Sequence, residues 1–152
     1  MIKEYTYYEA DTVLNLINKI DIEEYFINYK VSIKEYNLEI IKSLMFNYKS
    51  VFLGIDNELM IFDIPSVYER ENLIEVILMN YEKKELWNEG IKKIKSYAPD
   101  FGWTHLRIVV LEKQMTRKLK EVLLKSSFTL VGKFHAENNQ DEKLIYELSL
   151  EV

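Results

Sequence analysis

The sequence contains no cysteine and has little glycine or proline. Its 152 residues include four Gly and two Pro. Without Cys there can be no disulfide, thiolate metal site or Cys nucleophile, which fits a reducing compartment, and we expect a cytoplasmic protein. The scarcity of Gly and Pro predicts short loops between regular elements. The first residues form no apolar signal core and no apolar run is long enough to span a membrane, so we expect no membrane partner.

Charge and hydrophobic content narrow the class further. The net charge is −5, which argues against nucleic acid as a partner, because neutralising phosphates dominates that affinity. An acidic chain can still attract a cationic substrate such as an amine. Hydrophobic residues make up 48% of the chain, ample for a core, and the length favours one domain covering residues 1–152. The two histidines, His105 and His135, lie far apart in sequence, and we expect no metal site.

The first third of the chain carries helical patterns, so we expect residues 1–50 to form a helical N-terminal part. Asp21 with Glu24 and Ser32 with Glu35 have the spacing of capping boxes, and each predicts the start of a helix. One helical face before them carries the apolar residues Val13, Leu16, Ile17 and Ile20.

From residue 51 the pattern changes to that of strands, and we expect residues 51–152 to form the core sheet. Val51–Ile55 and Leu59–Ile64 are β-rich runs joined by Asp56-Asn57, which predicts a hairpin. Glu71–Met79 is apolar on both faces, as in a central strand covered on each side.

The second half alternates helices and strands. Pro99 and Gly102 are expected to close the first of its helices. A strand, a helix and a further strand in succession predict a right-handed crossover with a parallel pair. The fold class is therefore α/β (α+β): a mixed, mostly antiparallel sheet with helices on both faces. The expected elements are a helix at Glu85–Tyr97, a strand at Leu106–Leu111, a helix at Met115–Ser126 and strands at Thr129–Glu137 and Leu144–Leu150.

Three segments sharpen this order of elements. Tyr81–Gly90 follows the central strand and opens a helix, Val110–Phe128 joins a strand to a capped helix, and Thr129–Leu150 holds a closing hairpin. Together they resemble the GCN5-related N-acetyltransferase (GNAT) family over roughly residue 51 to the end. The family's pyrophosphate-loop pattern is kept at Tyr81, Lys84, Leu86 and Glu89.

The resemblance implies acetyl-CoA as cofactor. In the family, two strands splay apart, pantetheine pairs with the exposed strand edge, and loop amides at a helix N-terminus bind the pyrophosphate. The family's Arg stands here as Glu82, and its loop glycines are replaced. Either lysines hold the phosphates instead, or the segment is an ordinary helix N-terminus whose glutamates favour the helix dipole and whose lysines lie in solvent. The implied cofactor-binding residues are Ile77, Leu78, Met79, Lys83, Lys84, Glu85, Leu86, Trp87, Asn88 and Thr116. A basic set on the next helix, including Lys118 and Lys125, is either a solvated face or an attraction for the 3′-phosphate.

The acid and base residues follow from the same resemblance. Glu71 takes the position of the family's strand carboxylate and Glu75 lies on the same face, so either could accept the amine proton, directly or through water. The family's thiolate-protonating Tyr is replaced by Leu123. Tyr25, Tyr29 and Tyr36 are candidates for the acceptor pocket, or else belong to the core.

We therefore expect an enzyme that transfers an acyl group from acetyl-CoA to a small-molecule or peptide amine by direct attack on the thioester. A non-catalytic GNAT-fold binding or interaction module that has lost coenzyme A binding is the alternative, and an unrelated regulatory α/β protein is a third. The sequence leaves a homodimer open.

Overall fold

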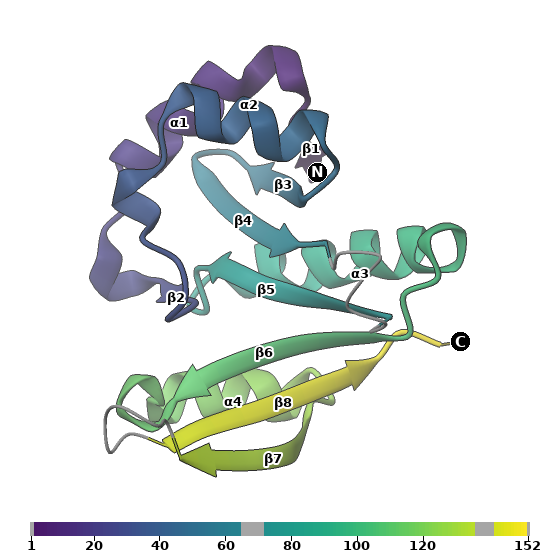
Figure 1. The fold of residues 1–152 in the computed structure, drawn as a ribbon. Helices are drawn as coiled ribbons and strands as arrows, with labels where there is room; N and C mark the ends of the chain where they lie inside the picture. Colours follow the sequence, from purple (N-terminus) through teal and green to yellow (C-terminus); the bar gives the residue numbers. More distant parts are fainter. Residues whose placement is uncertain (1, 65–71, 136–141, 152) are drawn as a thin grey trace.

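The computed structural model describes residues 2–64, 72–135 and 142–151, and Figure 1 shows their arrangement. These residues form an eight-stranded sheet in the order β1-β3-β4-β5-β6-β8-β7, with β2 pairing to β5 outside this path. Helices cover both faces, which confirms the predicted fold class. Within the same ranges, no helix is long and apolar enough to cross a membrane.

The first half of the sheet is antiparallel. It consists of β1 (Lys3–Glu4), β3 (Ser50–Ile55), β4 (Glu58–Asp63) and β5 (Leu73–Met79). The predicted hairpin is confirmed, because β3 and β4 pair antiparallel around a turn in which Asp56 has a φ of 53°. Asp is one of the few residues that adopt this left-handed conformation readily.

The second half contains the parallel pair. β5 and β6 (His105–Leu111) run parallel through the crossover helix α3 (Lys84–Phe101), as the order of elements predicted. β6 then pairs antiparallel with β8 (Glu142–Ser149), and β8 with β7 (Thr129–His135).

Alternating side chains of the sheet divide the core into two layers. Leu59 and Ile61 of β4 belong to the cluster under α1 (Ala10–Asn18) and α2 (Leu38–Phe46). Met60 and Phe62 of the same strand point to the opposite face, where α3 and α4 (Arg117–Lys125) pack. A strand covered on both faces must be apolar along its covered length, and the four residues between Glu58 and Asp63 in β4 are all apolar and buried.

The prediction of a helix after Asp21 is wrong. Asp21 caps only a 3-10 turn at Ile22–Glu24, and the chain then extends into the short strand β2 (Phe26–Ile27). Phe26 is 3% exposed within the main core, so burial in the sheet outweighs the local helical pattern.

Two other expected boundaries also differ. The capping box at Ser32 opens only a 3-10 turn at Ile33–Glu35, and α2 begins after Asn37, whose side chain accepts a hydrogen bond from the Ile40 N–H. Pro99 does not end α3, which continues to Phe101 and stops at Gly102 in the left-handed conformation. Pro removes one hydrogen bond from the last turns, whereas Gly102 provides the C-terminal reversal. A last 3-10 turn covers Glu112–Gln114.

Candidate functional site

The two parallel strands separate and form a fork. β5 and β6 pair from Leu73–His105 to Glu75–Arg107, and the pairing stops there while both strands continue. On its other edge β5 carries one extra residue, Ile77, because its register with β4 shifts between Val76 and Leu78. A bulge of this kind bends a strand away from its neighbour. The fork supplies the V-shaped gap that the acyltransferase hypothesis needs.

The strand β2 fills this fork. Phe26 pairs with Met79 and Ile27 with Leu78 in antiparallel register, and the Asn28 N–H donates to the Ile77 carbonyl at 2.8 Å. Figure 1 shows β2 at the open end of β5, beside the gap to β6. The edge predicted to bind pantetheine, Ile77–Met79, is thus paired with the chain's own β2.

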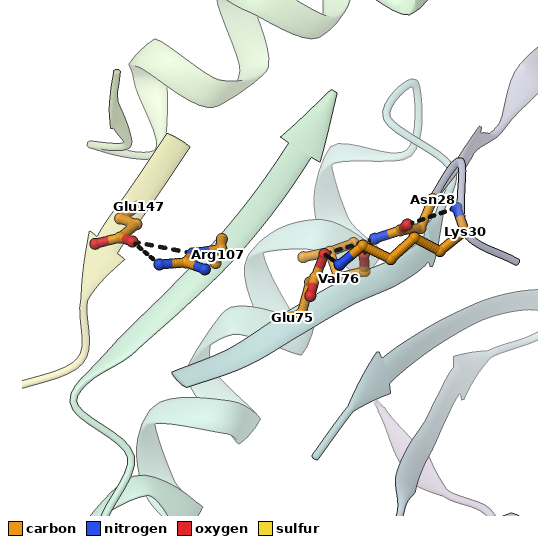
Figure 2. A network of polar contacts seen from close by, with 6 residues as sticks. All are labelled: Asn28, Lys30, Glu75, Val76, Arg107 and Glu147. Atoms are coloured by element: carbon orange, nitrogen blue, oxygen red, sulfur yellow. Dashed lines mark hydrogen bonds and ion pairs between the residues drawn. The ribbon is translucent and has the colours of Figure 1, made fainter. Parts of the chain in front are cut away.

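Two amide side chains hold β2 in place. Asn28 is fully buried, and its Nδ2 donates to Oε1 of Glu75 at 2.8 Å and to the Val76 carbonyl at 3.3 Å, as Figure 2 shows. Its Oδ1 accepts from the Lys30 N–H at 3.0 Å. From the 3-10 turn that follows β6, Gln114 Nε2 donates to the Ile27 carbonyl at 2.9 Å. β2 is therefore bonded both to β5 and to the turn that follows β6.

Glu75, the predicted base, lies where the fork opens. Its side chain is 21% exposed and its Oε1 lies 3.8 Å from Nζ of Lys30, in addition to the bond from Asn28. Its neighbour in register is Arg107, which donates from Nε and Nη2 to Oε2 of Glu147 at 3.0 and 2.9 Å (Figure 2). Glu75 thus has the partners expected for a partly buried carboxylate. The other predicted base, Glu71, lies outside the described residues.

The loop after β5 is organised by one side chain. Asn80 is buried; its Oδ1 accepts from the Glu82 N–H at 3.0 Å and its carbonyl from the Lys83 N–H at 3.1 Å. Its Nδ2 donates to Glu58 at 3.2 Å. Lys83 is the N-cap of α3 and gives the helix no side-chain hydrogen bond. The N–H groups at Lys84 and in the rest of the first turn lack intrahelical acceptors and can face an anion.

A cleft lies beside this helix start. It has a volume of about 480 Å³ and runs between the N-terminal turn of α3 and the outer face of α4. Three lysines line it, Lys84, Lys118 and Lys125, against two carboxylates, Glu82 and Glu121. The cleft therefore carries an excess of one positive charge from its lining (3 − 2), although the chain as a whole is acidic.

Not all of these cations are equally available. Lys118 Nζ lies 2.8 Å from Oε1 of Glu82, and this hydrogen bond raises the pKa of Lys118. Among the described residues, Lys84 and Lys125 form no ion pair. Glu82 stands at the position of the family's Arg. It forms an ion pair with Lys118, one of the cations that a phosphate would need.

The large Trp87 does not obstruct the loop. It is buried, stacks on Phe128 with ring centroids 5.7 Å apart, and donates from Nε1 to Oγ of Ser126 at 2.7 Å. Its ring forms the floor of the cleft and connects the start of α3 to the end of α4. Asn88 and Leu86, also predicted to bind the cofactor, differ in position: Asn88 lines the cleft, whereas Leu86 is buried in the core.

The remaining predicted cofactor contacts occupy helix and loop ends. Thr116 caps α4, because its Oγ1 accepts from the Leu119 N–H at 3.1 Å. Lys83 and Glu85 are exposed and line a second hollow on the β3–β4 side of the loop. Leu123, at the position of the family's acid, is fully buried and cannot donate a proton.

The three candidate tyrosines do not gather in one pocket. Tyr25 donates to the Glu58 carboxylate, and burial and that carboxylate raise its pKa above the ordinary value. Tyr36 packs on the α1–α2 core, where burial and then Asp63 raise its pKa to about 12. Tyr29 lies between the ammonium groups of Lys30 and Lys143, 5.8 and 4.8 Å from its ring centre.

Sequence reasoning missed the amide residues at the fork. Asn28 lies in a segment predicted to be helical, and neither Gln114 nor Asn80 belongs to a recognisable motif. Their roles depend on which strand edge they meet, and no local pattern indicates that. By contrast, Lys118 and Lys125 were visible as part of a basic helix face.

The residues fit one part of coenzyme A and not the other. The cleft offers room, lysines and helix amides for the nucleotide and its phosphates. The pantetheine arm has no open strand edge, since β2 pairs with Ile77–Met79. In this conformation the residues suit the nucleotide part and not the pantetheine arm.

Comparison with known proteins supports the fold. No known family's sequence profile and no curated protein sequence matches the chain. Several solved structures, however, match the chain. A probable acetyltransferase from Staphylococcus epidermidis superposes with a TM-score of 0.71 at 12% identity, covering 98% of both chains. An acetyltransferase of the GNAT family from Streptococcus pneumoniae gives 0.67 at 10% identity, again over 98% of both.

A third structure was solved with ligands. The microcin C7 self-immunity acetyltransferase MccE, in complex with acetyl-CoA and AMP, gives a TM-score of 0.64 at 15% identity over 97% of this chain and 92% of that one. At these identities the likeness establishes architecture rather than activity. The chain therefore has the fold of the GCN5-related N-acetyltransferases, as the resemblance predicted.

Proposed function

We propose that this protein is an acyl-CoA-dependent N-acyltransferase that transfers an acyl group, acetyl in the simplest case, to an amine. The observation that carries the proposal is the cleft at the start of α3. Lys84 and Lys125 line this cleft, and Lys84 is also the first residue of α3, whose N-cap gives no side-chain hydrogen bond. Lysines and a helix N-terminus are both suited to phosphate.

Within this proposal Glu75 is the base. It is a described carboxylate at the mouth of the fork, and a carboxylate there can accept the proton of an attacking amine. Acyl-CoA, when bound, supplies the activated thioester. The described residues place no acid at the position of Leu123, so the departing thiolate would leave without help from that residue. Glu71 stays a prediction.

The second candidate is a non-catalytic module with the same fold. It is favoured by the pairing of β2 with β5, which closes the fork to pantetheine. On this alternative the protein binds neither coenzyme A nor an acyl donor, and the fold serves an interaction.

Binding of ligand fragments separates the two. We would titrate the protein with 3′-phospho-ADP, the nucleotide part of coenzyme A, and follow Trp87 fluorescence in a Trp103→Phe background. Trp87 lines the cleft and Trp103 does not, and the chain has only these two tryptophans. A saturable change, together with a raised melting temperature, is expected for the enzyme.

The activity itself is tested with acetyl-CoA and a panel of polyamines and peptide N-termini, by following release of the free thiol. Glu75→Gln should lower the rate while leaving 3′-phospho-ADP binding intact. If neither 3′-phospho-ADP nor acetyl-CoA alters the melting temperature at millimolar concentration, the non-catalytic module is correct.

A further inference from the structure

We propose that β2 is a strap that closes the cofactor fork, and that its release from β5 admits the pantetheine arm and frees Glu75 in the same movement. This inference rests on the proposed function. It explains why the cleft beside α3 suits the nucleotide of coenzyme A while the strand edge at Ile77–Met79 is already paired with β2.

The strap is attached over a very short length. β2 contains two residues, between a 3-10 turn at Ile22–Glu24 and an irregular stretch that reaches the next turn at Ile33. Its polar attachments are the pairing with Ile77–Met79 and the bonds made by Asn28 and Gln114. Elements held by so few contacts belong to the least stable part of a fold and open locally. Phe26 is its one deeply buried apolar anchor.

Pantetheine can offer the edge of β5 the same kinds of hydrogen-bonding groups as β2 does. β2 offers backbone N–H and C=O groups to the edge of β5, and pantetheine carries two amides of the same chemistry. The carbonyl of Ile77, which now accepts from Asn28, would regain a donor from the cofactor. Because the edge is satisfied in both states, neither state leaves buried polar groups unpaired, and ligand binding can shift the balance between them.

The strap also restrains the candidate base. Asn28 Nδ2 donates to Glu75 at 2.8 Å, and Lys30, two residues further on, lies 3.8 Å from the same oxygen. Both partners leave with β2, because both belong to the segment that follows it. Release would remove a hydrogen-bond donor and a cation from Glu75, which leaves its oxygens free to contact an attacking amine. Cofactor entry and the freeing of Glu75 are therefore coupled.

Gln114 offers a mild way to loosen the strap. Its Oε1 accepts from the Leu111 N–H at 3.0 Å, a local bond, while its Nε2 holds the Ile27 carbonyl. Gln114→Glu keeps the acceptor and sets a carboxylate oxygen against that carbonyl. We expect faster hydrogen exchange at the amides of residues 26–28, with unchanged exchange in the β6–β8 ladder. Asn15→Asp, which makes the same change of charge at an exposed position of α1, is the matched control.

A disulfide can lock the strap. Asn28 and Ile77 form a hydrogen-bonded pair, so Ile27 and Leu78 form the adjacent non-hydrogen-bonded pair, whose Cα separation suits a disulfide. The natural chain has no Cys, so Ile27→Cys/Leu78→Cys creates a unique bond. The oxidised and reduced forms of this one variant are then compared, which cancels any loss of packing at Leu78.

The measured quantity is the ratio of affinities for coenzyme A and 3′-phospho-ADP. Gln114→Glu should raise this ratio by about tenfold, because apparent affinity scales with the fraction of molecules that are open. Oxidation of the double-Cys variant should reduce the ratio to about one, and reduction should restore it, with 3′-phospho-ADP binding constant throughout.

The outcomes separate the two proposals. An equal ratio in the oxidised and reduced forms, or unchanged exchange at residues 26–28 in Gln114→Glu, overturns the strap. Failure of 3′-phospho-ADP to bind any form overturns the proposed function instead, and hydrogen exchange would then still decide whether β2 opens.

Discussion

The indole nitrogen of Trp87 donates a 2.7 Å hydrogen bond to the hydroxyl of Ser126, which joins the first turn of α3 to the residue that ends α4. Both residues line the cleft that also contains Lys84, Lys118 and Lys125. Where the family has a small residue, this chain thus has a large one that is turned inward and fixed.

The first prediction concerns that bond. Ser126→Ala should lower the free energy of unfolding by about 1 kcal/mol, because the indole N–H loses its acceptor in a partly buried place. Trp87→Phe should cost more, since it also removes packing on Phe128. In a double-mutant cycle measured by urea denaturation, the coupling should be about 0.5–1.5 kcal/mol. Strictly additive effects would show that the bond contributes nothing.

The second prediction concerns the cations of the cleft. Lys84→Ala and Lys125→Ala should each weaken 3′-phospho-ADP binding by about tenfold, the scale of one lost charge-assisted hydrogen bond. Binding to the natural protein should also weaken as salt is raised. Lys95→Ala, which removes an exposed lysine of α3 that does not line the cleft, is the control. Equal losses in all three variants would point to net charge rather than to a site.

The third prediction concerns Glu82. Its Oε1 forms an ion pair with Nζ of Lys118 at 2.8 Å, and both residues line the cleft. Glu82→Gln should therefore tighten 3′-phospho-ADP binding several-fold, because it removes a negative charge and releases a cation for phosphate. Glu89→Gln, a neutralisation on α3 outside the cleft lining, should have little effect in the same calorimetric titration. Unchanged or weaker binding in Glu82→Gln would exclude phosphate from this position.

The fourth prediction concerns alkaline stability. The folded protein raises the pKa of Tyr36 to about 12, by burial and by the nearby Asp63, whereas an unfolded Tyr titrates near 10. The neutral phenol therefore contributes stability that is complete below about pH 10 and is lost as the pH rises toward 12. Relative to Tyr36→Phe, the natural protein should lose about 2 kcal/mol over this interval.

Thermal or urea unfolding at several pH values measures this loss. Tyr8→Phe serves as the comparison, because that ring is 91% exposed. If Tyr36→Phe and the natural protein decline in parallel between pH 10 and 12, Tyr36 titrates as an ordinary tyrosine and is not buried as described.

The sheet and its order were accessible from sequence because period and turn chemistry are local. Asp56-Asn57 between two β-rich runs predicted the β3–β4 hairpin, and the run ending at Met79 predicted a strand covered on both faces. The crossover through α3 then required a parallel partner. Boundaries failed where a local signal was weak against the rest of the fold, as at Pro99, which the helix tolerates near its end.

Only part of the candidate site could be predicted from the sequence. The resemblance placed Lys84 at the start of α3, but it placed Lys118 only on the next helix, as a solvated residue or an attraction for the 3′-phosphate. The segment from Asp21 to Tyr29 has helical spacing, yet it forms a 3-10 turn followed by the strand β2, because Phe26 gains more from burial in the sheet than a helix would give it.

By itself the sequence determined the architecture, the lysine pair Lys83-Lys84 at the start of α3 and the loss of the loop glycines, since each depends on residues close together in the chain. Only the tertiary structure decided that Asn28 meets Ile77 and Glu75, nearly 50 positions further along the chain. Pairing between distant strand edges leaves no local pattern, because backbone groups are the same in every residue. Whether the fork is open or closed is set by that pairing.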